Sequence, residues 1–138
     1  MNKIIIIFSL FVGFVYAENG RPVMVGEVRE VGDEPINHGY ICGGIGEIIG
    51  INKHGDGFVA IRSGPGSKYK IKKKVVRNGT VVIACDSSAG WLGILYKNDL
   101  SSAGDCDTEN KPIQKRYPYK GPCQIGWVYA KYFNFTAN

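Results

Sequence analysis

The stretch FVAIRSGPGSKY, residues 58–69, decides the fold of this chain. Its first half alternates Val59 and Ile61 with less apolar neighbours, which is the period of a half-buried β-strand. Gly64-Pro65-Gly66 then forces a rigid loop, because proline fixes its own φ and glycine permits a positive φ. The stretch therefore predicts a short strand that runs into a loop of fixed shape.

Short segments of the same kind lie on both sides of this stretch, with turn residues between them. The strand expected at 80–86 is rich in β-branched residues, and another is expected at 91–96. Further strands are expected at 46–52, within 69–77 and at 126–129, the last of them followed by a short turn of helix at 130–133. No segment sustains the apolar period of about 3.6 residues that a helix needs, so the sequence predicts an all-β fold.

The order of these motifs resembles the bacterial Src homology 3 (SH3b) domain. The resemblance is carried by AIRSGPGSxY at 60–69, NGTVV at 78–82 and the dipeptides Gly90-Trp91 and Gly126-Trp127. It implies a small, strongly bent, five-stranded SH3-like barrel over residues 46–134. The family's barrel is not itself catalytic. Members occur in the bacterial envelope, alone or fused to cell-wall enzymes, and several bind peptidoglycan or peptides.

The chain departs from that family pattern in two places. Family members usually join the last two Gly-Trp strands by a tight turn, whereas here an insertion at 97–124 intervenes. An N-terminal extension at 18–45 precedes the barrel and is polar, with no sustained period. We expect it to be an extended arm or tail, in which 23–31 could form an edge strand.

The N-terminus predicts export. Lys3 precedes an apolar run at 4–15, and Val15-Tyr16-Ala17 fits the −3 and −1 positions of a signal-peptidase site. The run is shorter than the about 20 residues of a membrane-spanning helix. We therefore expect a signal peptide at 1–17, a periplasmic or secreted mature chain that begins at Glu18, and no stable membrane insertion after cleavage.

The cysteine count fits the same compartment. Four cysteines follow the expected cleavage point, and an even count in an exported protein indicates two disulfides. Their spacing lacks the Cys-x-x-Cys pairs typical of zinc sites, so we expect no metal. Three pairings are possible. We favour Cys106–Cys123 with Cys42–Cys85, because the first pair flanks a polar loop that needs closing.

Composition argues against several other functions. The net charge of +5 is mild and falls short of the dense basic clusters that favour nucleic acid, so no nucleic-acid partner is expected. The only histidines, His38 and His54, lie in the extension and in an expected turn, which gives nucleophilic catalysis little support. We expect no enzyme activity and no cofactor. A solvated face is the preferred interpretation of an acidic group without calcium-loop spacing: Asp99, Asp105, Asp107 and Glu109.

Binding has better candidates. Aromatic side chains in or beside loops, together with basic neighbours, are typical of recognition surfaces. The predicted ligand or partner site comprises Tyr69, Trp91, Tyr96, Lys115, Arg116, Tyr117 and Tyr119. Core packing is the favoured interpretation of Trp91 and Trp127, with ligand stacking as the alternative. For the tyrosines at 117 and 119, packing of the insertion onto the barrel is as good an interpretation as binding.

Two functions fit these observations. The first is an envelope module that recognises a cell-wall (peptidoglycan) peptide or glycan. The alternative is a periplasmic protein–protein partner, such as an inhibitor or immunity protein of a secreted toxin or wall hydrolase, because a rigid insertion lowers the ordering cost of binding. The ligand, the binding face and the oligomeric state stay open at this point.

Overall fold

The structure is a computed structural model, and it describes residues 20–26, 41–102, 105–109, 111 and 115–137. The expected signal peptide and most of the N-terminal extension therefore lie outside the described residues. The described chain is all-β, with antiparallel strands, as the sequence predicts.

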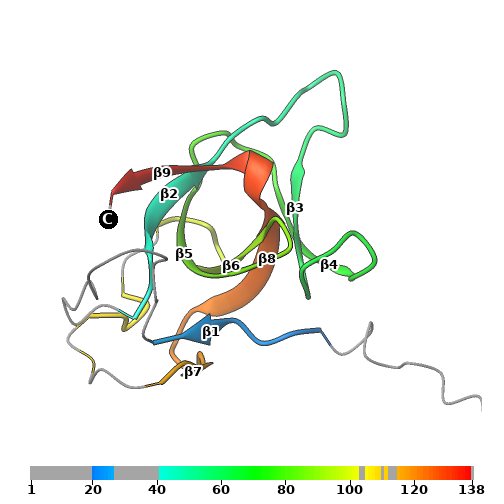
Figure 1. Cartoon of the computed structure of the whole chain (residues 1–138). Helices are drawn as coiled ribbons and strands as arrows, with labels where there is room; N and C mark the ends of the chain where they lie inside the picture. Colours follow the sequence, from blue (N-terminus) through cyan, green and yellow to red (C-terminus); the bar gives the residue numbers. More distant parts are fainter. Residues whose placement is uncertain (1–19, 27–40, 103–104, 110, 112–114, 138) are drawn as a thin grey trace, which may run out of the picture.

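Nine strands and one short 3₁₀ helix make up the described chain (Figure 1). In chain order they are β1 (Met24–Val25), β2 (Gly44–Ile48), β3 (Val59–Arg62), β4 (Ile71–Val75), β5 (Val81–Ser88), β6 (Trp91–Tyr96), β7 (Tyr117–Pro118), β8 (Gln124–Tyr129), η2 (Ala130–Tyr132) and β9 (Phe133–Ala137). Strands β1 and β7 pair with each other. The other seven form one curved sheet in the order β4-β3-β8-β6-β5-β2-β9.

The three strands in the middle of this sheet are buried on both faces. Alternate residues of β5 enter two different apolar clusters: Ile83 and Cys85 join an outer core, and Val82 and Ala84 join an inner core. This dual burial explains why β5 and β6 contain almost continuous apolar runs rather than a strict alternation. The inner core is enclosed by the curved sheet, and the outer core lies under added chain.

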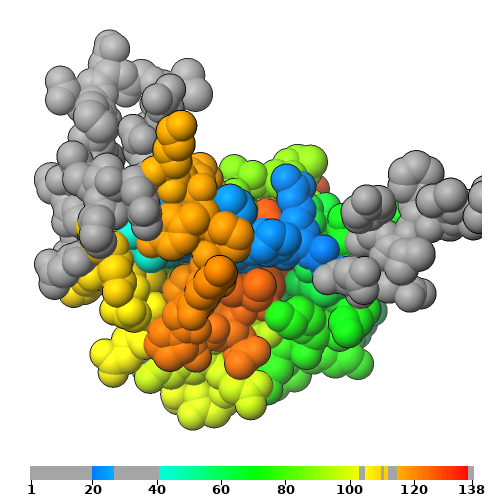
Figure 2. All heavy atoms as spheres, turned by 90° about the horizontal axis from the view of Figure 1, so that it is seen from below, coloured from blue at the N-terminus to red at the C-terminus, as the bar shows by residue number. Residues whose placement is uncertain are grey.

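The added chain is a segment that we call the strap, residues 20–26, and the insertion, residues 97–124. In the strap, Val23 and Val25 are fully buried in the outer core. Figure 2 shows the strap (blue) lying between the insertion (orange) and the rest of the molecule. The expectation of an extended arm or tail does not account for this burial, but the alternative of an edge strand within 23–31 agrees with β1, which pairs with β7.

Two further expectations need correction. Strand 126–129 is not the last, because β9 follows η2 and pairs antiparallel with β2. Its Phe133 ring fits against the sheet only because Gly46 has no Cβ, which would overlap that ring. The main sheet also holds seven strands rather than five, and no ladder joins its edge strands β4 and β9 within the described residues, so the sheet is not a closed barrel.

Candidate functional site

An open groove of about 660 Å³ lies at one end of the curved sheet. Three segments form its walls: the loop between β3 and β4, the turn between β5 and β6, and the junction of β8 with η2. It is lined by Arg62, Pro65, Gly66, Ser67, Lys68, Tyr69, Ala89, Trp91, Tyr129 and Tyr132. A smaller hollow of about 200 Å³ shares four of these residues and extends toward Asp56 and Phe58.

Aromatic rings dominate the groove. Trp91 and Tyr129 face each other across the β6–β8 ladder, with ring centroids 5.5 Å apart. Tyr132 packs edge-on against Tyr129 at 6.2 Å. Tyr129 is 44% exposed although it is a large ring on a central strand. Partly exposed rings of this kind offer stacking surface to a ligand at little conformational cost.

The loop that carries Tyr69 has a fixed shape. The Arg62 guanidinium donates to the Tyr69 carbonyl oxygen at 2.9 Å, and the Ser63 amide donates to the Lys70 carbonyl oxygen at 2.9 Å. The Tyr69 ring lies directly over Gly64, where any Cβ would overlap it. The sequence-based interpretation of residues 64–66 as a rigid loop therefore agrees with the structure, and Arg62 helps to hold it.

The structure separates the predicted site residues into two groups. Tyr69 and Trp91 line the groove, but Tyr96 and Tyr119 do not. Tyr96 is 3% exposed in the inner core, and this burial raises the pKa of its hydroxyl. Its expected binding role is therefore wrong: alternation along β6 points its ring inward rather than toward a ligand.

Tyr119 is a clamp for the insertion rather than a contact residue. Its ring is 8% exposed in the outer core, and its hydroxyl donates to the Cys106 carbonyl oxygen at 2.6 Å. The same hydroxyl accepts from the Cys123 amide at 3.0 Å. The Tyr119 ring thus closes the loop that Cys106–Cys123 also closes, which favours the packing interpretation over the binding one.

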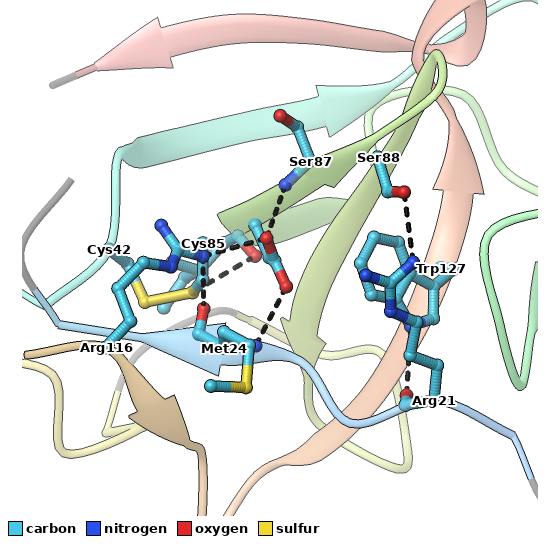
Figure 3. A network of polar contacts seen from close by, with 10 residues as sticks. Arg21, Met24, Cys42, Cys85, Ser87, Ser88, Arg116 and Trp127 are labelled. Atoms are coloured by element: carbon cyan, nitrogen blue, oxygen red, sulfur yellow. Dashed lines mark hydrogen bonds and ion pairs between the residues drawn. A yellow bond between two sulfur atoms is a disulfide. The ribbon is translucent and has the colours of Figure 1, made fainter. Parts of the chain in front are cut away.

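The remaining predicted residues, Lys115, Arg116 and Tyr117, lie on the insertion and do not line the groove. Arg116 is engaged structurally: it forms an ion pair of 2.8 Å with Asp86 and donates to the Met24 carbonyl oxygen at 3.2 Å (Figure 3). Tyr117 is half-buried and pairs with Val25 across the small sheet. Only Lys115 is exposed without a structural contact of this kind within the described residues.

The strap is tied to the sheet by a polar network that the sequence did not reveal. The Asp86 carboxylate accepts from the Met24 amide at 3.0 Å and from the Ser87 amide at 2.8 Å, besides pairing with Arg116. The Trp127 indole donates to the Arg21 carbonyl oxygen at 3.1 Å (Figure 3). Trp127 is fully buried, which agrees with core packing as its favoured role.

Both expected disulfides are formed. Cys42–Cys85 joins the segment just before β2 to β5, and Cys106–Cys123 closes the insertion. This is the pairing that we favoured from the sequence. Disulfides persist in oxidising compartments, so their presence agrees with an exported protein.

The groove residues that sequence reasoning missed are Tyr129 and Tyr132. Their only signal was the GWVY motif followed by a helical turn, and the motif does not say that Tyr129 lies opposite Trp91. Within the described residues, no group of three or more metal-ligating side chains is close enough to hold a metal ion. No helix in that part of the chain is long and apolar enough to cross a membrane.

Comparison with known proteins adds no relative. No protein-family model matches the chain, and neither a curated protein nor a solved structure matches it.

Proposed function

We propose that this chain is an exported, non-catalytic SH3-like binding module that recognises a cell-wall peptide or glycan in its aromatic groove. The two disulfides support a site of action outside the cytoplasm. The signal peptide at 1–17 and the periplasmic or secreted location remain parts of this proposal.

Strand topology supports the SH3-like assignment. Strands β5, β6 and β8 form a meander, η2 follows β8, and β9 returns to pair with β2. An SH3-like unit of five strands would then consist of β2, β5, β6, β8 and β9. The β3–β4 hairpin would then lie within the long first connection, and the insertion would lengthen the connection between the third and fourth strands.

The single observation that carries the binding proposal is the group of partly exposed rings that share one groove: Tyr69, Trp91, Tyr129 and Tyr132. Extended peptides dock in aromatic grooves at low entropic cost, and flat rings also offer stacking faces to sugars. A groove lined by such rings favours recognition of a strand-like ligand over a catalytic role.

The test compares two exposed aromatic residues. Tyr129→Ala removes a ring of the groove, and Phe135→Ala removes a similarly exposed ring (52%) that does not line it. The disulfide-bonded protein is incubated with insoluble peptidoglycan at low salt and the bound fraction is measured by sedimentation. We expect Tyr129→Ala to weaken binding about tenfold or more, as loss of a hot-spot aromatic does, and Phe135→Ala to leave it unchanged. Wild-type protein recovered entirely in the supernatant would count against the proposal.

A protein partner that docks on the insertion is the second candidate. The observation in its favour is that Tyr119 and Cys106–Cys123 fix the insertion, while Lys115 and Lys120 stay exposed on it. A double variant, Lys115→Glu with Lys120→Glu, separates the two candidates. It should abolish capture of an envelope protein if the insertion is the contact face, and it should leave peptidoglycan binding by the groove intact.

A further inference from the structure

Positive charge is concentrated in one part of this chain. Residues 53–77, which contain β3, β4 and their flanking turns, carry eight basic residues and one acidic residue, a net charge of +7. The rest of the chain carries nine basic and eleven acidic residues, a net charge of −2. The mild charge of the whole chain therefore hides a strongly basic hairpin.

The charges of this hairpin are not neutralised internally. Within the described residues, no ion pair joins any of the eight basic side chains to a carboxylate. Lys72 has a lowered pKa, first because it is partly buried and then because Lys70 places a second positive charge nearby. Like charges crowded on one hairpin disfavour the compact state, so an anionic partner would relieve an existing repulsion.

The basic hairpin forms one wall of the groove. Arg62 and Lys68 line it directly, and exposed Lys70 follows Tyr69 in the chain. Lys131 does not line the groove but is next to Tyr132 in the chain, and its ammonium lies 5.9 Å from the centre of the Tyr132 ring. Among the residues that the structure describes, no carboxylate lines the 660 Å³ groove, and Asp56 lies only in the smaller hollow beside it. The groove aromatics thus lie beside the basic hairpin, with Lys131 next to Tyr132.

We propose that the ligand of the groove is an acidic glycan, whose sugar rings stack on the groove aromatics and whose anionic groups contact the basic side chains beside them. This inference rests on the proposed function, and it narrows the ligand class of the same site.

Two features favour a glycan over other polyanions. Stacking rings that line a groove suit a single polymer strand, whereas an anionic lipid surface contacts a convex or flat face. The disulfides indicate an extracytoplasmic compartment, where acidic glycans are abundant and nucleic acid is not an expected partner. Aromatic stacking and positive charge together distinguish this groove from one that reads a neutral peptide.

The experiment is affinity electrophoresis of the disulfide-bonded full chain in gels that contain polygalacturonate, heparin or neutral dextran. The groove variant carries Lys68→Gln, Lys70→Gln and Lys131→Gln, which remove three charges but keep every ring. The control carries Lys97→Gln, Lys115→Gln and Lys120→Gln, which remove the same net charge from the insertion, whereas the groove variant changes Lys68 in the lining and lysines next to Tyr69 and Tyr132. The two acidic polymers distinguish carboxylate from sulfate as the anionic group.

We expect retardation by at least one acidic glycan and none by dextran. The groove variant should bind about tenfold more weakly, since exposed charge contacts each contribute modestly, and the control should change binding less than twofold. Retardation should also fall as salt rises from about 50 to 200 mM. Tyr129→Ala should weaken binding as much as the groove variant does.

Several outcomes would overturn the inference. Equal retardation by dextran would make charge irrelevant while leaving the proposed function intact. Equal losses in the two triple variants, or no loss in Tyr129→Ala, would indicate attraction by net charge rather than a site in the groove. Tighter binding to phosphatidylglycerol vesicles or single-stranded DNA than to either glycan would assign a different partner. Acidic-glycan binding that depends on the groove lysines, without peptidoglycan binding, would support this inference and reject the cell-wall ligand.

Discussion

Tyr119→Phe separates the structural role of this residue from the binding role that its position in the sequence suggested. The substitution removes one oxygen atom and keeps the ring in the outer core. Two backbone groups of the insertion then lose their partner: the Cys106 carbonyl oxygen at 2.6 Å and the Cys123 amide at 3.0 Å. The variant therefore tests the clamp without opening a large cavity.

The magnitude follows from the two lost hydrogen bonds. A buried polar group left without a partner costs about 1–3 kcal/mol, and here one backbone group is buried and the other partly buried. We expect the free energy of unfolding to fall by about 2 kcal/mol, which corresponds to a drop in Tm of about 10 °C for a domain near 100 residues. The change in the free energy of unfolding is measured by urea denaturation under oxidising conditions, followed by tryptophan fluorescence.

Tyr117→Phe is the matched control, because the hydroxyl of Tyr117 forms no hydrogen bond within the described residues. It should change the free energy of unfolding by less than about 0.5 kcal/mol. Ligand binding in the groove should be unaffected by either variant. Equal free energies of unfolding for Tyr119→Phe and the wild type would refute the structural role of the Tyr119 hydroxyl. Loss of ligand binding at unchanged stability would indicate that Tyr119 contacts the ligand.

Three further perturbations test other parts of the structure. Gly64→Ala should displace the Tyr69 ring and weaken groove binding about tenfold, as measured by sedimentation with peptidoglycan. Gly66→Ala is the control and should be tolerated, because its Cβ would lie an ordinary 3.5 Å from the same ring. Burial raises the pKa of Tyr96, so its contribution to the free energy of unfolding should be fully present below pH 10 and be lost as pH rises through the folded-state pKa. Because burial also raises the pKa of Tyr119, Tyr96→Phe should reduce the alkaline fall in urea titrations without abolishing it. Asp86→Asn should lower the free energy of unfolding by about 2 kcal/mol, because the carboxylate accepts two backbone amides and an arginine; an unchanged denaturation midpoint would contradict this.

Local patterns were enough to predict most of the strands. Strand β6 has the bounds that its apolar run indicated, and β5 follows from its β-branched residues. Both disulfides could also be predicted, because an even cysteine count and a polar loop between two cysteines constrain the pairing. These features depend on residues that are near each other in sequence or on simple counting.

The parts that the sequence did not reveal depend on long-range pairing. The sequence suggested an edge strand within 23–31, but nothing local in the strap indicates that Val23 and Val25 are buried, because their cover is the insertion about 90 residues away. Strand β9 was missed because it needs β2 as a partner and Gly46 as a space for Phe133. The groove was half-predicted: Trp91 was identified, but its neighbour Tyr129 follows only from the β6–β8 register.

The strap is connected to the walls of the groove by Arg21. The Arg21 amide donates to the Ser63 carbonyl oxygen at 2.8 Å, and Ser63 immediately precedes the loop that carries Tyr69. The Arg21 guanidinium donates to the Ser88 hydroxyl at 3.1 Å, and Ser88 immediately precedes the turn on the facing wall (Figure 3). The Arg21 carbonyl oxygen accepts a hydrogen bond from the indole of Trp127, which lies on the same strand as Tyr129. Arg21 therefore joins all three segments that wall the groove. The strap therefore helps to fix the shape of the groove, and a groove of fixed shape would lose less entropy when a ligand binds.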